Sequence, residues 1–316
     1  IPAVPHRVQA GWHYHFLGIG GVGMSALAEL LHGRGIAVSG SDSESSATLE
    51  RLRGLGIVVR VGHEAAALEG AQAVVYTPAV PTRHPIWQAV EARGLACLHR
   101  VDLLAAITRE GRTVAVAGTH GKTTCTAALG HVLATAGMDP TVLVGGHVPA
   151  FGGRNVRVGQ GELFVVEADE SDGSFTRLSP EVVLLTNAEP DHLDFHGSAE
   201  AVRAAFADFL ARLQVGGTGG GAGHLVYCAD DPTAAALGAE YRSVGTAESY
   251  ALHHPANWRV AVQQQAPGGL GFTVAGDHEA APLPLPIRTR MMGRHNALNL
   301  TGVLASARHL GLPLRQ

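Results

Sequence analysis

The chain has 316 residues, of which 46% are hydrophobic and 16% are charged, and it carries a formal net charge of -4 at pH 7. This length is enough for two domains with sizeable cores, and the composition is typical of folded globular proteins, which excludes a disordered chain. The slightly negative charge excludes a general attraction to nucleic acid or to an anionic membrane, so a polyanionic ligand would need a local binding site.

The cysteine content and the hydropathy pattern indicate a cytoplasmic protein. Cys97, Cys125 and Cys228 are odd in number and far apart, which favours a reducing compartment over a disulfide framework. No apolar run approaches the ~20 residues that span a bilayer, and residues 1–12 lack the pattern of a signal peptide. Because the first residue is Ile1 rather than Met, we expect that the chain begins inside a longer gene product.

Strand and helix patterns alternate in the first part of the chain. A strand, a glycine-rich turn and a helix are predicted within 13–35, further strands at 36–42 and 71–80, and a helix at 84–94. Short apolar runs separated by helices are typical of buried parallel strands. They predict a doubly wound, Rossmann-like α/β domain, which we assign to residues 1–107.

A nucleotide-binding fingerprint lies inside this first domain. Gly18, Gly20 and Gly23 form a G-x-G-x-x-G pattern between the strand and the helix, and Asp42 follows at the end of the next strand. In this pattern a diphosphate contacts the helix N-terminus and the acid binds a ribose hydroxyl. The fingerprint predicts a nucleotide that contains a diphosphate, without saying which one.

The α/β pattern restarts around 101–112, which predicts a boundary near 106–112 and a second, P-loop α/β domain over 108–316. Buried strands are expected in the apolar runs 113–118, 140–146, 162–169 and 181–187. A hairpin is predicted at 263–276. The glycine-rich stretch 215–223 is interpreted as a surface loop rather than a phosphate cradle.

Residues 117–124, with the sequence AGTHGKTT, look like a modified phosphate loop. The usual form is G-x-x-x-x-G-K-[ST], but its first glycine would fall at Val116, and a glycine stands at 118 instead. A strand precedes the loop, a helix follows it, and acids end a later strand, which favours a nucleotide site over an ordinary turn. Lys122 would then contact the β- and γ-phosphates, and the Thr123 hydroxyl would bind Mg²⁺.

Two polar segments that follow strands are candidates for metal binding. Glu167 begins the acidic segment 167–175, and Asp191, His192, Asp194 and His196 crowd the segment 186–197. Oxygen ligands suit Mg²⁺, so His192 is either a ligand or a structural residue. Further on, Asn296 and Asn299 lie one helical turn apart, where their amides either contact adenine or cap a helix.

These segments, taken in order, resemble the Mur ligases of peptidoglycan synthesis. The motifs that carry the resemblance are HFLGIGGVGMSALAELL, VSGSD, AGTHGKTT, EADESDGSF, TNAEPDHLD and GRHNALN, which together extend over nearly the whole chain. The resemblance identifies the loop at 117–124 as this family's variant of the phosphate loop. It implies a cytoplasmic ligase of cell wall biogenesis, on which cell shape and cell division depend.

The resemblance also assigns site residues. It implies that the first domain holds the UDP part of a substrate rather than NAD, through Gly18, Gly20, Gly21, Gly23, Ser41, Asp42, Arg154 and Asn155. It implies ATP binding by Gly118, Thr119, His120, Gly121, Lys122, Thr123, Thr124, Asn296 and Asn299. The implied metal ligands for Mg²⁺ are Thr123, Glu167 and His192, and the implied catalytic residues are Lys122, Glu167 and His192.

Among Mur ligases, the motifs are most similar to those of the members that join L-alanine to the carboxylate of UDP-N-acetylmuramate through an acyl phosphate. Three alternatives stay open: a ligase that attaches a preformed peptide to UDP-N-acetylmuramate, an NAD-dependent oxidoreductase, and a non-catalytic nucleotide-binding regulator. The expected partners are these small molecules, without nucleic acid or membrane, in a monomer or a homodimer.

The sequence departs from the family pattern at two points. His84 stands where an Asn is expected before Pro, which puts that substrate contact in doubt. These ligases also carry a third α/β domain after the helix that holds Asn296, whereas this chain stops at Gln316. We therefore expect residues 1–316 to bind ATP with Mg²⁺ and UDP-N-acetylmuramate, and to need the third domain for ligation.

Overall fold

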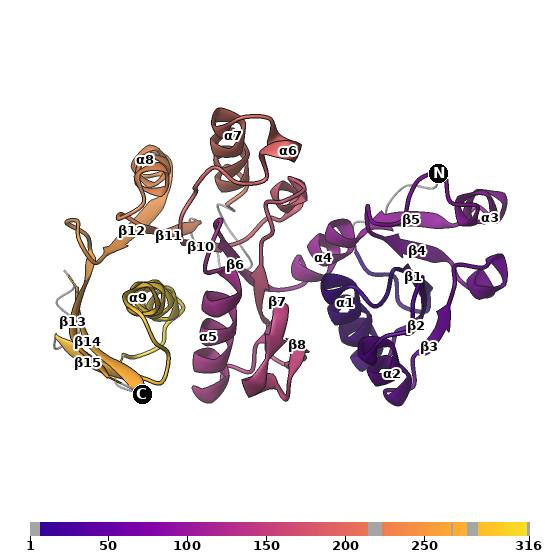
Figure 1. Cartoon of the computed structure of the whole chain (residues 1–316), viewed down its shortest axis with the longest axis horizontal. Coiled ribbons are helices and arrows are strands. Elements are labelled where there is room, and N and C mark those ends of the chain that lie inside the picture. Colours follow the sequence, from indigo (N-terminus) through magenta and orange to yellow (C-terminus); the bar gives the residue numbers. More distant parts are fainter. Residues whose placement is uncertain (1–6, 214–222, 267, 277–283, 315–316) are drawn as a thin grey trace. The chain divides into compact units, whose positions relative to one another are not determined.

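The computed structural model describes residues 7–213, 223–266, 268–276 and 284–314. It divides into two compact units, one formed by 1–110 with 143–158 and the other by 111–142 with 159–316 (Figure 1). The segment 143–158 groups with the first unit, although the sequence pattern assigned it to the second domain. None of the described helices is long and apolar enough to cross a membrane.

The first unit is built on a five-stranded parallel sheet in the order β3-β2-β1-β4-β5. The strands are β1 (His13–Leu17), β2 (Ala37–Asp42), β3 (Val58–Val61), β4 (Ala73–Tyr76) and β5 (Ala96–His99). The helices are α1 (Val22–Gly33), α2 (Ala47–Gly54), η1 (Ala65–Leu68), α3 (Ile86–Ala92) and α4 (Arg100–Thr108). This order, with each strand followed by a helix or a short helical turn, confirms the predicted Rossmann-like α/β fold.

The second unit contains a larger, mixed sheet. Its strand order is β15-β14-β13-β12-β11-β10-β6-β9-β7-β8. These strands are β6 (Arg112–Ala117), β7 (Thr141–Val148), β9 (Leu163–Glu167), β10 (Val182–Leu185), β11 (His224–Cys228), β12 (Thr246–Ala251), β13 (Trp258–Ala266), β14 (Gly269–Gly276) and β15 (Leu285–Thr289). β7 continues into the first unit, where η2 (Pro149–Phe151) and β8 (Arg154–Arg157) follow it.

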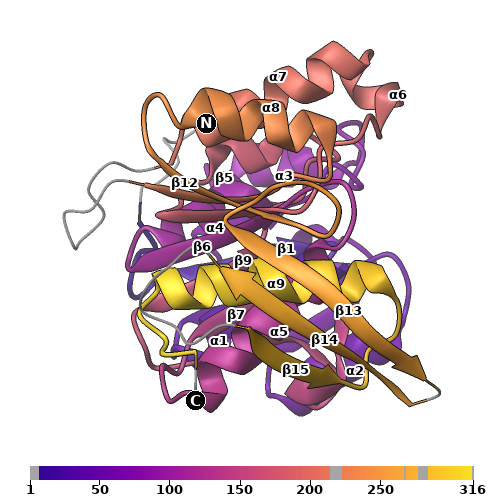
Figure 2. The ribbon, with the colours of Figure 1, turned by 90° about the vertical axis from the view of Figure 1, so that its left-hand side faces the viewer.

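Helices cover both faces of this sheet. They are α5 (Lys122–Thr135), η3 (Ser174–Arg177), α6 (Leu193–His196), α7 (Ala199–Leu210), α8 (Pro232–Tyr241) and α9 (Arg294–His309). α9 packs against α5 and β13, as Figure 2 shows, whereas α7 and α8 pack together. Strand β10 is buried along its whole length because helices lie on both of its faces, which explains its continuous apolar sequence.

The antiparallel strands β13 and β14 confirm the hairpin predicted at 263–276, with Ala266 paired to Gly269 next to the turn. They extend a sheet whose central strands β6, β9, β10 and β11 run parallel. Because the carboxyl ends of parallel strands meet at one edge, the loops after β6, β9 and β10 lie together there. The predicted surface loop at 215–223 falls outside the described residues, except for Gly223.

Candidate functional site

The loop between β6 and α5 forms the centre of the candidate site. Gly121 has a φ of +85° and precedes the first residue of α5, Lys122, so the helix N-terminus opens toward the loop. Gly118, with a φ of +133°, follows β6, and a Cβ at this position would lie 2.1 Å from Thr186 Oγ1. The backbone of the loop therefore approaches the end of β10 more closely than any side chain at 118 allows.

Residues after β10 hold the loop in this shape. Thr186 Oγ1 donates to the carbonyl oxygens of Ala117 at 3.1 Å and His120 at 2.6 Å. The Asn187 side chain accepts from His120 N at 2.8 Å and donates to His120 O at 3.2 Å. On the other side, Thr119 Oγ1 donates to the carbonyl oxygen of Glu189 at 2.9 Å. The exposed His120 ring is thus carried on a backbone that is fixed by hydrogen bonds on both sides.

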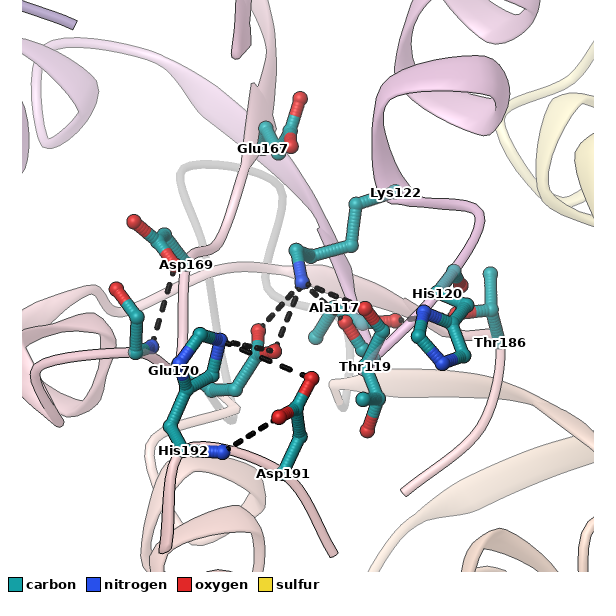
Figure 3. Close-up of polar contacts among 12 residues, drawn as sticks. Ala117, Thr119, His120, Lys122, Glu167, Asp169, Glu170, Thr186, Asp191 and His192 are labelled. Atoms are coloured by element: carbon teal, nitrogen blue, oxygen red, sulfur yellow. Dashed lines mark hydrogen bonds and ion pairs between the residues drawn. The ribbon is translucent and has the colours of Figure 1, made fainter. Parts of the chain in front are cut away.

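Lys122 turns its amino group inside the loop and toward the acidic segment after β9 (Figure 3). Its Nζ donates to the carbonyl oxygen of Gly118 at 2.6 Å, and to the two carboxylate oxygens of Glu170 at 2.7 and 2.9 Å. Both partners of this ion pair are buried, with side-chain exposures of 12% for Lys122 and 3% for Glu170. The one cation of the loop is therefore held by a carboxylate outside the predicted set of site residues.

Thr123 and Glu167, two of the predicted metal ligands, lie in contact. Thr123 Oγ1, in the first turn of α5, donates to Glu167 Oε1, at the end of β9, over 3.0 Å. Within the described residues no group of three or more His, Cys, Asp or Glu side chains could hold a metal ion. Mg²⁺ binds protein through one or two carboxylates and completes its shell with water and phosphate oxygens, so this pair of oxygen donors fits that ion.

His192, the third predicted ligand, lies beside Glu170. Its Nε2 is 4.0 Å from Glu170 Oε1 and 4.0 Å from Asp191 Oδ2, contacts that Figure 3 draws as dashed lines. Its backbone is left-handed, with a φ of +50°, and its N–H donates to Asp191 Oδ1. From the same segment, His196 Nε2 lies 2.9 Å from the carbonyl oxygen of Glu170. The segment after β10 therefore closes over Glu170.

The two asparagines predicted to contact adenine lie on α9. A Cβ at Gly121 would lie 3.1 Å from Asn299 Nδ2, so this amide borders the phosphate loop. Asn296 Nδ2 donates to the carbonyl oxygen of Met292 at 2.7 Å, just before the helix begins.

Thr124, in the first turn of α5, is half-buried. Burial raises the pKa of the Cys125 thiol far above its usual value, so this neighbouring residue stays neutral.

The glycine-rich turn of the first unit has its own set of contacts. The N–H groups of Gly18 and Ile19 donate to Ser41 O at 2.8 and 3.1 Å, and Gly20 N donates to Asp42 Oδ2 at 2.7 Å. Gly21 immediately precedes α1, and Gly23 lies in its first turn. The Ser41 side chain is completely buried, whereas Asp42 is half-buried at the end of β2.

Arg154 and Asn155 belong to the segment that returns to the first unit. Arg154 Nη1 forms an ion pair with the buried Glu29 of α1 at 3.1 Å. Asn155 is completely buried, and its amide donates to Val22 O and to Ser25 Oγ in the first turn of α1. The contacts of both residues hold this segment against α1, the helix that follows the glycine-rich turn. The contact of Asn155 with a substrate stays a prediction.

Two site residues were missed at the sequence level. Glu170 is one of four acids within residues 167–172, and nothing in their spacing distinguishes the one that meets Lys122. Asn187 lies two residues after the end of β10. Its side-chain amide forms hydrogen bonds with both the backbone N–H and the carbonyl oxygen of His120. For Asn187, the position of a polar residue just past a buried strand was a usable indication.

Two family models match the chain. Residues 13–112 match the model described as Mur ligase family, catalytic domain, and residues 116–307 match the one described as Mur ligase middle domain. The chain is 44% identical over 310 residues to the UDP-N-acetylmuramate–L-alanine ligase of Symbiobacterium thermophilum, and 45% identical over 301 residues to that of Kineococcus radiotolerans. The alignments cover 96% and 94% of this chain, but 61% of each relative. The chain thus spans about three fifths of the length of these curated relatives.

Two solved structures resemble the fold over 96% of this chain. The UDP-N-acetylmuramate–alanine ligase of Thermotoga maritima has a TM-score of 0.82 at 29% identity, with 66% of its chain covered. The UDP-N-acetylmuramate:L-alanyl-gamma-D-glutamyl-meso-diaminopimelate ligase of Neisseria meningitides has a TM-score of 0.81 at 27% identity, with 95% of that chain covered.

Proposed function

This chain belongs to the Mur ligase family, and we propose that the protein containing it joins L-alanine to the carboxylate of UDP-N-acetylmuramate at the expense of ATP, in cytoplasmic peptidoglycan precursor synthesis. The observation that carries the proposal is the identity of 40–45% with ligases of this name, along 94–96% of the chain. The geometry of the loop around Lys122 supports the use of ATP.

The reaction proceeds in two steps. The carboxylate of the muramoyl group attacks the γ-phosphorus of ATP, which forms an acyl phosphate and releases ADP. The neutral amine of L-alanine then attacks the acyl carbonyl carbon, inorganic phosphate leaves with the bonding electron pair, and the proton lost by the amine nitrogen passes to the departing phosphate or to water. Negative charge accumulates on the transferring phosphoryl group in the first step, so a preorganised cation next to it lowers the barrier.

Lys122 supplies that cation. In the structure its ammonium is bound by Glu170 and by the loop carbonyls, so it stands inside the loop before ATP arrives. Phosphate oxygens then take the ammonium as a partner, while the N–H groups at the start of α5 bind the phosphates. Glu170 keeps the lysine extended toward the loop, which spares part of the ordering cost of binding.

Thr123 and Glu167 would hold Mg²⁺, because their oxygens lie 3.0 Å apart at the mouth of the loop. The ion would add positive charge against the β- and γ-phosphates. His192 lies 4.0 Å from the carboxylates of Glu170 and Asp191, and it would bind the ion directly or through a water. Asn299, which borders the loop, contacts adenine or the nearest phosphates.

The first unit would bind the UDP part of the substrate at the glycine-rich turn and Asp42. Ser41 is buried under that turn and Asn155 is buried against α1, so both would support the site from the interior of the unit. An NAD-dependent oxidoreductase is a weaker alternative, because that activity does not explain the phosphate loop around Lys122 or the acidic residues that contact it. The ligase that attaches a preformed peptide is the closer rival, since its fold is equally similar.

The experiment that separates these two ligases is a substrate screen. The protein is expressed from its whole reading frame, and radiolabelled L-alanine or the tripeptide L-alanyl-γ-D-glutamyl-meso-diaminopimelate is offered with UDP-N-acetylmuramate, ATP and Mg²⁺. We expect label from L-alanine, and not from the tripeptide, in the UDP-linked product. Incorporation of the tripeptide alone would assign the protein to the rival reaction.

A further inference from the structure

A network of alternating histidines and serines crosses the sheet of the first unit. His13 Nε2 and His15 Nδ1 each lie 2.8 Å from Ser39 Oγ. His15 Nε2 lies 3.1 Å from Ser41 Oγ, which lies 2.8 Å from His63 Nδ1. We name these five residues the His–Ser network. It is a continuous line of four hydrogen bonds that ends next to the predicted nucleotide site.

Strand pairing builds this line. β1 and β2 pair in parallel, with His15 opposite Ser39 and Leu17 opposite Ser41. Side chains on a strand alternate between faces, so His13 and His15 share one face of the sheet with Ser39 and Ser41. His15, Ser39 and Ser41 are 1%, 6% and 0% exposed. Each polar atom in the middle of the network therefore depends on its neighbours in the network for hydrogen bonds.

The middle histidine is neutral. Burial, and then the charges of His13, His63 and Arg60, lower the pKa of His15 to about 4. A neutral imidazole has one N–H donor and one acceptor nitrogen, and each serine has one O–H to donate. If all four hydrogen bonds form and each buried serine O–H is donated within the network, the donors must point in one direction along the whole line. Two arrangements satisfy this condition: His13, His15 and His63 all carry their proton on Nε2, or all carry it on Nδ1.

The end of the network at His63 selects between the two arrangements. Ser41 occupies Nδ1 of this ring, so Nε2 is left for a further partner. Burial and the neighbouring His84 lower the pKa of His63, whereas Asp42 acts to raise it. The rings of His63 and His84 meet edge to face, 5.4 Å apart. Nε2 is the nitrogen that faces no partner within the network, and Asp42 lies opposite Val61, two residues before His63, so we choose the arrangement in which all three protons are on Nε2.

We propose that His15 is a positioning residue: through Ser41 it locks His63 in the Nε2–H tautomer, so that His63 presents a hydrogen-bond donor to an acceptor oxygen of the bound nucleotide. The proposal rests on the proposed function, in which the first unit holds the UDP part of the substrate. A locked donor costs no tautomer change on binding, and it discriminates against a ligand that offers a donor at the same place. Ser39 and His13 continue the line of hydrogen bonds from His15 toward the amino ends of β1 and β2.

The tautomers can be measured directly on residues 1–316. The chain is labelled with ¹⁵N-histidine, the resonances of His13, His15 and His63 are assigned by single His→Gln substitutions, and the imidazole nitrogen shifts distinguish the two tautomers. We expect Nε2–H in all three rings without any ligand. Nδ1–H in His63, or different tautomers in His15 and His63, would overturn the proposal.

Cutting the network provides the second readout. Ser41→Ala removes the last link, and we expect a mixed tautomer at His63 and about fivefold weaker UDP binding, the loss typical of one hydrogen bond. Ser39→Ala cuts the line on the far side of His15 and should shift the tautomer in the same sense, which keeps the test usable if Ser41→Ala does not fold. Ser43→Ala is the matched control, because Ser43 contacts Asp42 but lies outside the network.

The outcomes separate the inference from the function on which it rests. Unchanged tautomers and unchanged UDP affinity in both network variants would overturn the positioning role. If the unsubstituted chain has the common Nε2–H tautomer but does not bind UDP, the tautomer lock is supported and the proposed function fails. Weaker UDP binding in Ser43→Ala, equal to that in Ser41→Ala, would also contradict the specific role of the network.

Discussion

The ammonium of Lys122 lies 2.7 and 2.9 Å from the two carboxylate oxygens of Glu170, in a pair that is nearly closed to solvent. A buried ion pair contributes little net stability, but removal of one partner leaves an uncompensated charge. The stability of the folded loop therefore depends on the presence of both charges, that of Lys122 and that of Glu170. It also means that a phosphate must compete with Glu170, or share the lysine with it.

Loss of Lys122 should strongly slow ATP turnover. We expect Lys122→Ala to lower kcat by about 10²–10³, because one preorganised charge is lost from the transferring phosphoryl group. The same variant should lose about 3–5 kcal/mol of unfolding free energy, since Glu170 is left buried without its partner. Phosphate release from the whole protein and urea unfolding measure the two effects.

The control for this prediction is the double substitution Lys122→Met with Glu170→Gln. It removes both charges, so the unfolding free energy should recover while turnover stays low. Turnover that returns together with stability would show that Lys122 acts through the fold alone, and would remove its assignment to the phosphates.

ATP should shield Lys122 from chemical modification. Lys122 is the single lysine among the 316 residues, so an amine reagent can modify only this side chain and the N-terminal amine. We expect ATP with Mg²⁺ to slow modification of Lys122 at least tenfold, with the N-terminal amine of the same molecule as the internal control. Mass spectrometry of the two peptides gives both rates. Equal rates with and without ATP would contradict contact between this lysine and the nucleotide.

Close approach at Gly118 makes a second position sensitive. Gly118→Ala places a methyl group 2.1 Å from Thr186 Oγ1 and 2.8 Å from Asn187 O, so the loop must shift and ATP affinity should fall at least tenfold. Gly137→Ala is the matched control, because Gly137 also has a positive φ, +83°, but nothing lies within 4 Å of its Cβ position. We expect this control to lose about 1 kcal/mol of stability from backbone strain and no ATP affinity. Calorimetry of ATP binding to both variants provides the comparison.

The metal site can be tested by titration with Mg²⁺. Glu167→Gln and His192→Ala should each raise the Mg²⁺ concentration that gives half-maximal activity, because each removes a direct ligand or one that acts through a water. Asp194→Asn is the control, since this exposed acid lies two residues from His192. An unchanged Mg²⁺ requirement in Glu167→Gln would leave its contact with Thr123 as a purely structural hydrogen bond.

Local patterns were sufficient to predict the fold and the centre of the site. The alternation of apolar runs and helices gave two α/β units, and the strands β1, β6, β9 and β10 lie where it placed them. Lys122 and Thr123 were recognisable because a phosphate loop needs a strand before it and a helix after it. Glu167 was recognisable as a residue at the carboxyl end of a strand, and β9 ends there. The domain boundary near residue 107 stays a prediction.

Other features depend on packing between distant segments. The course of 143–158 follows from contacts of Arg154 and Asn155 with α1, which a strand pattern cannot encode. The choice of Glu170 as the partner of Lys122 depends on how the acidic loop turns after β9. The period of two along β1 and β2 places His13, His15, Ser39 and Ser41 on one face, whereas His63 follows β3 and joins the network only through the fold.

The first unit should distinguish uridine nucleotides from NAD. We expect calorimetry on residues 1–316 to show binding of UDP-N-acetylmuramate and no measurable affinity for NADH. Asp42→Asn should weaken the binding of UDP-N-acetylmuramate, because Asp42 supports the turn at Gly20 and lies at the ligand edge of the sheet. Tight binding of NADH would revive the oxidoreductase, whatever the second unit binds.

The stability of the first unit should depend on His15 between pH 6.5 and 4. Burial lowers the pKa of His15 from 6.5 to about 4 in the folded chain, whereas the unfolded chain keeps a value near 6.5. Between these values the unfolded state binds a proton that the folded state does not bind. The free energy of unfolding therefore falls as the pH drops through this window, by about 3 kcal/mol in total at ~1.4 kcal/mol per pH unit, and the loss is complete near pH 4.

Hydrogen exchange of the peptides that contain β1 and β2 can measure this slope at pH 7, 5.5 and 4.5, after correction for the intrinsic exchange rates. His15→Gln removes the group that titrates, so its unfolding free energy should be lower at pH 7 but should decline less steeply toward pH 4.5. The exposed His131 provides the control, and His131→Gln should keep the slope of the unsubstituted chain. An equal decline in His15→Gln would mean that other groups carry the acid sensitivity. His63 would then be the next candidate, because burial lowers its pKa as well.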